Sequence, residues 1–122
     1  MYTDPFAHLV KMEEYRNVDQ KILEKLPERP KRSHKGMFGK ALCIAGSVNM
    51  AGAAYLCAGA AYRSGAGLVR ILTPEENRVI LQTLLPEAVM TTFEQNERGA
   101  LDNILEEALS WATVAAIGPG LG

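Results

Sequence analysis

Residues 114–122 read VAAIGPGLG, a short apolar run followed by a loop with three glycines in five residues. An apolar run of this length, bounded by turn residues, is typical of a strand buried in a parallel sheet. The loop would then lie at the carboxyl end of the strand, which is where open α/β sheets bind ligands. Because glycine has no side chain, the backbone of 118–122 can lie directly against a ligand. A plain turn is the alternative reading of the same glycines.

Similar short, mostly apolar runs recur along the chain and predict strands at 41–45, 68–72 and 88–92. Residues 50–64 are rich in alanine and lack proline, which predicts one helix. Helical spacing predicts a second at 99–110 and a third from Thr73 to Pro86. For that third helix, Thr73 as N-cap, Pro74 as first residue and Glu76 at the third position make a capping box. This alternation predicts an α/β fold, with a mostly parallel sheet flanked by helices.

Residues 1–30 form a separate stretch in this reading. Apolar residues recur at helical spacing over 8–26, and Pro27 and Pro30 end the pattern. We expect a helical lead-in and connector over 1–30 and the main domain over 31–122.

Composition limits the classes of function. The chain has 122 residues, and its 13 basic and 14 acidic side chains leave a formal charge of −1. This balance does not favour nucleic acid or an anionic membrane as a partner. No apolar run approaches the ~18 residues that span a bilayer, and the first residues do not resemble a secretory signal. Cys43 and Cys57 lie in apolar stretches, so we expect reduced core cysteines in a cytoplasmic protein.

A second candidate ligand loop follows the first predicted strand, at residues 46–52. Gly46 lets the chain turn away from the strand, and Ser47 and Asn49 can cap the next helix or donate to a ligand. A helix that starts here presents free N–H groups that suit phosphate. The segment is neither a Walker A loop nor G-x-G-x-x-G, and a tight strand-to-helix turn explains it equally well. We expect the side-chain-poor segments 46–53 and 118–122, here called ledges, to meet at the rim of one ligand-binding crevice.

Other polar residues are weaker candidates. His34 could donate a proton and Lys35 could approach an anion, although a solvated connector explains both. Arg63 and Arg70 could pair with phosphate or with a neighbouring subunit, although a cation near a helix C-terminus is favoured in any case. No nucleophile–base pair or metal cluster is evident in the sequence.

Taken in order, five segments closely resemble the NAD(P)H-hydrate dehydratase family, from about residue 27 onward. The segments are Ser33-His34-Lys35-Gly36-x-Phe38-Gly39, Ile44-Ala45-Gly46-Ser47-x-x-Met50-x-Gly52-Ala53-Ala54, Arg63-Ser64-Gly65-Ala66-Gly67-Leu68-Val69, Leu85-Pro86-Glu87-Ala88 and Ile117-Gly118-Pro119-Gly120-Leu121-Gly122.

The resemblance implies a ribokinase-like α/β fold and a role in nicotinamide nucleotide repair. Such enzymes dehydrate NADHX and NADPHX, the hydrated forms of NADH and NADPH. They spend ADP, which becomes AMP and phosphate, or ATP, and Mg²⁺ is implied by the kinase-like chemistry. Phosphorylation of the ring hydroxyl turns a poor leaving group into a good one.

Carried over by position, the resemblance implies substrate contacts in both loops. The predicted contacts are Gly52, Ala53, Gly118, Gly120, Leu121 and Gly122, with Ser47, Asn49, His34 and Lys35 as further candidates. The family's histidine motif, nucleotide loop and catalytic aspartate have no counterpart in these residues, so we expect no catalytic residue or metal ligand here.

We therefore expect an incomplete sheet, the N-terminal part of a dehydratase domain without an upstream epimerase domain. The fragment would be inactive alone, and the missing C-terminal half or a second chain would complete it, with a homo-oligomer as the expected assembly. The alternatives are another ribokinase-like small-molecule kinase, or a non-catalytic fragment that binds a dinucleotide or a partner.

Overall fold

The computed structural model describes residues 19–122, and the chain divides into two compact units, Met1–Lys31 and Arg32–Gly122. In the first unit, α1 (Gln20–Leu23) starts at Asp19, whose side chain accepts a hydrogen bond from the backbone N–H of Ile22. The helix predicted over 8–26 falls mostly outside the described residues. Within them it ends at Leu23, ahead of Pro27.

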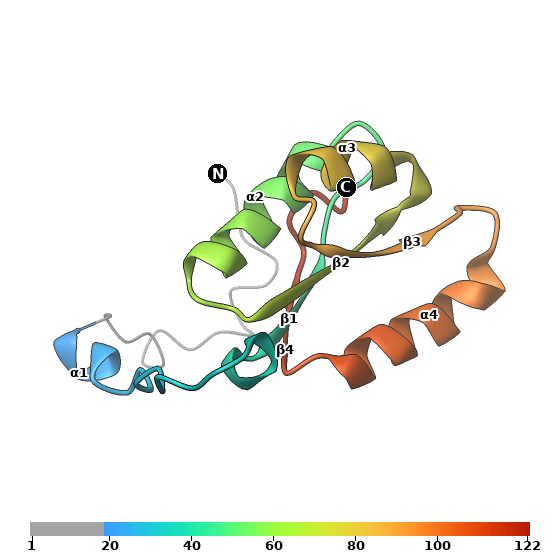
Figure 1. Ribbon diagram of the computed structural model, residues 1–122. Coiled ribbons are helices and arrows are strands. Elements are labelled where there is room, and N and C mark those ends of the chain that lie inside the picture. Colours follow the sequence, from blue (N-terminus) through green and yellow to red (C-terminus); the bar gives the residue numbers. More distant parts are fainter. Residues whose placement is uncertain (1–18) are drawn as a thin grey trace, which may run out of the picture. The chain divides into compact units, whose positions relative to one another are not determined.

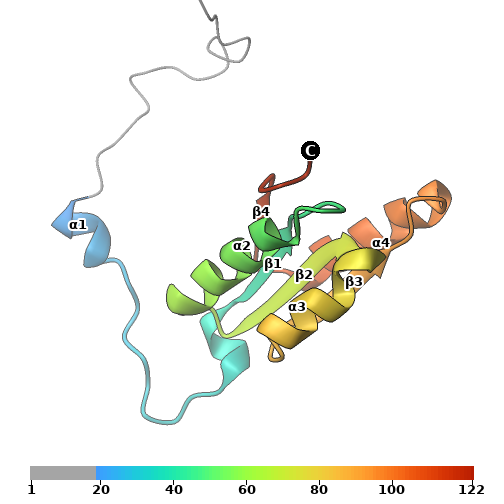
Figure 2. The same ribbon diagram turned by 90° about the horizontal axis from the view of Figure 1, so that it is seen from above.

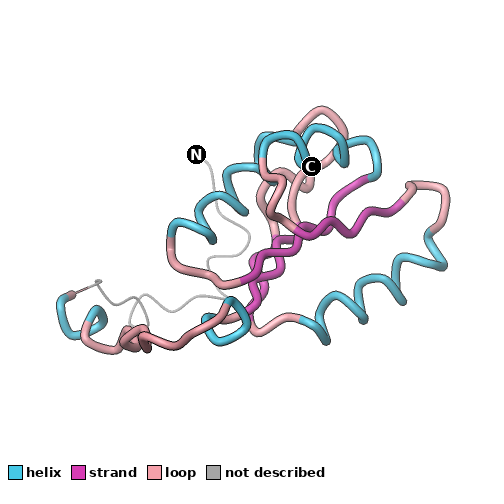
Figure 3. Tube along the Cα trace, viewed as in Figure 1, coloured by secondary structure: helices cyan, strands magenta, loops and turns pink. Residues whose placement is uncertain are grey.

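The second unit is built around a parallel four-stranded sheet, in the order β3-β2-β1-β4 (Figures 1 and 3). The predicted alternation of strands and helices is confirmed. The strands are β1 (Lys40–Ile44), β2 (Leu68–Pro74), β3 (Val89–Phe93) and β4 (Val114–Ile117), the α-helices are α2 (Ala51–Arg63), α3 (Arg78–Leu84) and α4 (Arg98–Trp111), and the 3₁₀ turns are η3 (Lys35–Phe38) and η4 (Glu75–Asn77).

Helices cover both faces of the sheet, with α2 and α3 on one face and α4 on the other (Figure 2). Successive residues of β1 point to opposite faces, so the strand serves two apolar clusters. Cys43 packs with Ala54, Ala58 and Leu81 under α2 and α3, whereas Leu42 packs with Ala108 under α4. Burial on both faces explains why β1 is apolar after Lys40, its first and only half-buried residue.

The start of the third predicted helix differs from the capping-box expectation. Thr73 and Pro74 belong to β2, where they pair with Thr92 and Phe93 of β3. Glu75 then begins a 3₁₀ turn, and α3 starts only at Arg78. Pairing with a strand almost twenty residues later extends β2, and this long-range pairing overrides the local capping signal. The predicted stop before Pro86 is confirmed, because α3 ends at Leu84.

Arg70 is used by the fold itself. Its Nη1 lies 3.1 and 2.8 Å from the two carboxylate oxygens of Glu107 on α4, and its guanidinium lies 4.5 Å from the centre of the Trp111 ring. The Lys40 ammonium lies 5.7 Å from the same ring. These charged and cation–π contacts hold α4 against the sheet. The Arg70 side chain therefore pairs within the chain, instead of with the phosphate that was one reading of the sequence.

Candidate functional site: two loops at the carboxyl edge

The loops after β1 and β4 leave the sheet side by side. Ile44 and Ile117 are partners in the parallel register, so both chains turn at the same edge. The backbone N–H of Gly46 donates to the carbonyl of Pro119 at 2.8 Å, and that of Gly118 donates to the carbonyl of Ile44 at 3.2 Å. The predicted convergence of the two glycine-rich ledges is confirmed. The contact of these residues with a ligand stays a prediction.

The closest approach between the loops is at Gly120, which has a φ of +69°. A Cβ placed on Gly120 would lie 2.4 Å from the Cβ of Ala53, in the first turn of α2. Real carbon atoms that are not bonded stay about 3.5 Å or more apart. Both backbone conformation and space therefore require glycine at 120. A Cβ on Gly122 would lie 3.9 Å from the Ser47 hydroxyl oxygen, so the end of the loop also faces residues 47–50.

Neither Ser47 nor Asn49 caps α2, contrary to one reading of the sequence. The N-cap position is Met50, and its side chain makes no capping bond. The Ser47 carbonyl instead accepts the Met50 N–H at 2.9 Å, and Asn49 takes a φ of +72°, which closes a tight turn. This turn brings the start of a 13-residue helix to the junction of the two loops. A helix N-terminus without a side-chain cap suits an anionic group.

Two buried polar residues at this edge were not predicted from the sequence. Asn77 is 2% exposed, and its Nδ2 donates to the Ser47 carbonyl at 3.1 Å and to the Thr73 hydroxyl at 3.0 Å. Thr73 is fully buried. The only sequence signal for this pair is a threonine and an asparagine four residues apart, directly after an apolar strand.

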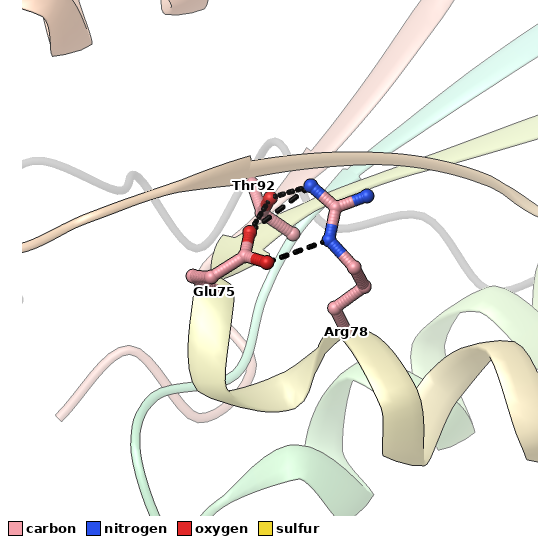
Figure 4. Close-up of polar contacts among 3 residues, drawn as sticks. All are labelled: Glu75, Arg78 and Thr92. Atoms are coloured by element: carbon pink, nitrogen blue, oxygen red, sulfur yellow. Dashed lines mark hydrogen bonds and ion pairs between the residues drawn. The ribbon is translucent and has the colours of Figure 1, made fainter.

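A charged cluster lies where β2 and β3 end (Figure 4). Arg78 donates to the Glu75 carboxylate from Nε at 2.8 Å and from Nη2 at 3.0 Å, and the Thr92 hydroxyl contacts both side chains. The hydrogen bonds from Arg78, and then that from Thr92, lower the pKa of Glu75. A carboxylate held ionised in this way is a poor proton acceptor, so the cluster is structural and not a general base.

His34 and Lys35 lie away from the two loops. The turn at 35–39 joins the amino ends of β1 and β2, where the Gly39 carbonyl accepts the backbone N–H groups of Gly67 and Leu68, both at 3.1 Å. A Cβ on Gly67 would lie only 1.7 Å from the Lys35 carbonyl oxygen. The backbone of Lys35 therefore packs at the amino ends of the parallel strands, whereas the two loops lie at their carboxyl ends. The structure does not bring these two candidates together with the others.

An apolar groove of about 620 Å³ lies between α2 and the β1–β4 side of the sheet. Small apolar side chains line it, among them Ala41, Cys43, Ala53, Cys57 and Ala116. Both cysteines are free thiols, as expected. Cys43 is 1% exposed, and burial, reinforced by the neighbouring Cys57, raises its pKa to about 12. This thiol is neutral near pH 7 and is not a nucleophile there.

The sequence profile of one protein family, described as NAD(P)H-hydrate dehydratase, matches residues 41–122. The chain belongs to the NAD(P)H-hydrate dehydratase family. It is 39% identical over 106 residues to the ADP-dependent (S)-NAD(P)H-hydrate dehydratase of Streptococcus pneumoniae, which is 86% of this chain and 34% of that enzyme. It is 38% identical over 107 residues to the bifunctional NAD(P)H-hydrate repair enzyme of Vibrio cholerae, covering 87% of this chain and 20% of that enzyme. The present chain thus spans a fifth to about a third of the length of these relatives.

Solved structures confirm the ribokinase-like fold. A ribokinase-like superfamily protein from Enterococcus faecalis superposes with a TM-score of 0.68 at 36% identity, over 86% of this chain and 35% of that one. The ADP/ATP-dependent NAD(P)H-hydrate dehydratase of Bacillus subtilis, co-crystallised with ATP and Mg²⁺, superposes with a TM-score of 0.53 at 32% identity, over 70% of this chain and 37% of that one.

Proposed function

We propose that this chain supplies the substrate-contacting edge of an ADP-dependent (S)-NAD(P)H-hydrate dehydratase. The reaction would dehydrate NADHX and NADPHX and convert ADP to AMP and phosphate. The observation that carries the proposal is the junction at Gly46, Ala53 and Gly120, where two side-chain-poor loops meet the start of α2. The names of the relatives supply the reaction, because several act on this substrate.

Gly52 fits a ligand at this edge, and its open surroundings are shared by Gly59 farther along α2. A Cβ on Gly52 would meet nothing within 4 Å, and its φ is not positive. Neither packing nor backbone conformation within the chain therefore explains a glycine in the first turn of α2, where it costs about 1 kcal/mol relative to alanine. A dinucleotide lying flat against this turn would explain it. We assign the dinucleotide to Gly52, Ala53, Gly118, Gly120, Leu121 and Gly122, with Ser47 and Asn49 beside them.

In this proposal the chain binds and orients the hydrate. The start of α2 would stabilise a phosphate of the dinucleotide, and the glycine loops would hold the nicotinamide end close to the backbone and exclude water. Precise placement matters because phosphoryl transfer depends mainly on positioning and electrostatics. Within residues 19–122, no three His, Cys, Asp or Glu side chains gather to hold a metal ion.

The free edge of β4 indicates where the rest of the site would attach. Val114 and Ile117 are each 61% exposed, and the apolar groove runs beside them. An unpaired apolar edge is a template for another strand. We propose that further parts of the fold, or a second chain, cover this edge, and that the protein is a homo-oligomer.

We further propose that the protein acts in the cytoplasm. Two free thiols fit a reducing compartment. No helix in the part of the chain that the structure describes could cross a membrane.

The test is turnover by the full-length protein. Purified protein would be incubated with NADHX, Mg²⁺ and either ADP or ATP, and the return of reduced-nicotinamide absorbance recorded. We expect turnover that needs a nucleotide and that is faster with ADP. The Streptococcus pneumoniae enzyme serves as the positive control. No turnover with either nucleotide, while that control is active, would refute the proposal, and phosphorylation of another small alcohol would favour a ribokinase-like kinase.

A further inference from the structure

Asn77 and Thr73 form a buried link between the sheet and the Ser47–Met50 turn. Asn77 Nδ2 donates to the Ser47 carbonyl and to the Thr73 hydroxyl, and both side chains are almost completely shielded from water. Buried amide groups are costly unless they are hydrogen-bonded, so these bonds are strongly preferred over alternatives. The link joins residues that lie thirty positions apart in the sequence.

The Ser47 carbonyl is the point where two hydrogen bonds hold the turn. It accepts the Met50 N–H from within the turn at 2.9 Å and the Asn77 amide from outside at 3.1 Å. The bond from Met50 closes the turn, but it does not place the turn relative to the sheet. The bond from Asn77 does so, because Asn77 stands at the end of η4, directly before α3.

Thr73 acts at the base of the same loop. Ile44, the last residue of β1, pairs with Leu72, so Thr73 lies one residue beyond the end of β1. A Cβ on Gly46 would lie 3.1 Å from the Thr73 hydroxyl oxygen and 3.4 Å from Asn77 Nδ2. The N–H of Gly46 in turn binds the Pro119 carbonyl. The link therefore reaches the backbone of the first loop directly and that of the second loop through one hydrogen bond.

From this geometry we infer that Asn77 and Thr73 are positioning residues for the hydrate. They set the spacing between the 46–50 and 118–122 loops, and with it the width of the ledge on which the substrate lies. This inference rests on the proposed dehydratase function. Neither side chain needs to touch the substrate. Both act through the backbone of residues 46 and 47.

The first arm of the test measures the turn itself and does not depend on activity. Amide hydrogen exchange at Met50 would be compared between the full-length wild-type protein and Asn77→Ala. We expect exchange at Met50 to rise about tenfold, because the carbonyl that binds its N–H loses its outer anchor. Thr83→Ala is the matched control, since it removes a side-chain bond on α3 to the Val79 carbonyl, away from the loop. Unchanged exchange at Met50 in Asn77→Ala would overturn the inference.

The second arm separates positioning from general destabilisation. Thr73→Val keeps the shape of the side chain and removes the hydroxyl, whereas Thr73→Ser keeps the hydroxyl. We expect Thr73→Val to raise the KM for the hydrate about tenfold and leave the KM for the nucleotide unchanged. Thr73→Ser should stay close to wild type. A merely structural role would lower the amount of active enzyme without changing either KM, and that result would overturn the inference.

The two arms also separate this inference from the proposed function. A wild-type protein that does not turn over the hydrate would refute the function, while exchange at Met50 would still decide whether Asn77 holds the turn. If Asn77→Ala fails to fold, exchange at Met50 in Asn77→Leu, which keeps a similar volume and also lacks the amide donor, decides the same question.

Discussion

Replacing Gly120 with alanine should force the two glycine-rich loops apart. The added Cβ would lie 2.4 Å from the Cβ of Ala53, about 1 Å or more short of an ordinary carbon–carbon contact. The backbone at Gly120 also has a φ of +69°, which an alanine adopts only under strain. Steric overlap and backbone strain therefore act at the same residue, and the two can be measured separately.

The expected magnitudes follow from these two terms. The left-handed conformation costs an alanine about 1–2 kcal/mol, and overpacking adds about 1–3 kcal/mol. Gly120→Ala should therefore lower the free energy of unfolding by about 2–5 kcal/mol. Ala53→Gly alone should cost about 1 kcal/mol, because glycine is a poor helix former. In the Gly120→Ala background the same change relieves about 1–3 kcal/mol of overlap but still costs about 1 kcal/mol as a helix residue. It should therefore restore about 0–2 kcal/mol, and the coupling energy of the cycle should be about 1–3 kcal/mol.

The assay is a double-mutant cycle, with unfolding by urea of the wild type, both single variants and the double variant. Gly122→Ala is the control, since it shares a positive φ of +89° but its Cβ would come no closer than 3.9 Å to another residue. That variant should show the strain without the overlap. If the effects of Gly120→Ala and Ala53→Gly simply add, the two residues do not touch and the assigned loop junction is wrong.

Three further predictions concern other parts of the chain. Gly67→Ala should destabilise the protein by about 3 kcal/mol or more, because its Cβ would collide with a backbone carbonyl. Gly59→Ala, in the open part of α2, should instead stabilise the protein by about 0.5–1 kcal/mol. Urea unfolding measures both changes. An NMR titration should place the pKa of Glu75 below its usual 4.5. The stabilising contribution of the Glu75 carboxylate is therefore present above pH 4.5 and is lost as pH falls through the lowered pKa. Arg78→Met should move the pKa of Glu75 back toward 4.5. The pKa of Cys43 is raised from 9.0 to about 12, so stability should fall as pH rises from 9 toward 12, and alkaline unfolding of Cys43→Ala should lack that loss.

Local sequence patterns were sufficient for most of the architecture. The predicted strand at 41–45 is β1 (Lys40–Ile44), the apolar run at 114–117 is β4, and the ends of α2 fall within a residue of the prediction. For β1 the pattern is reliable because a strand buried on both faces is apolar at its buried positions. The expectation of burial is wrong for β4, which pairs with β1 but is exposed at all four of its residues. The boundary at Thr73 was wrong for the opposite reason. Threonine before proline is a local capping signal, but pairing with β3 lies outside any local window.

The sequence by itself determined the order of strands and helices, and it identified the two glycine-rich loops by their lack of side chains. Only the tertiary structure decided which polar residues meet them. Asn77 reaches a backbone carbonyl thirty residues earlier, and Gly120 faces Ala53 across two elements. Neither contact leaves a mark in composition or periodicity, because each depends on the register that places Ile44 beside Ile117 and Leu72. The same register sends His34 and Lys35 to the far edge of the sheet, since the full length of β1 separates the turn at its amino end from the loop at its carboxyl end.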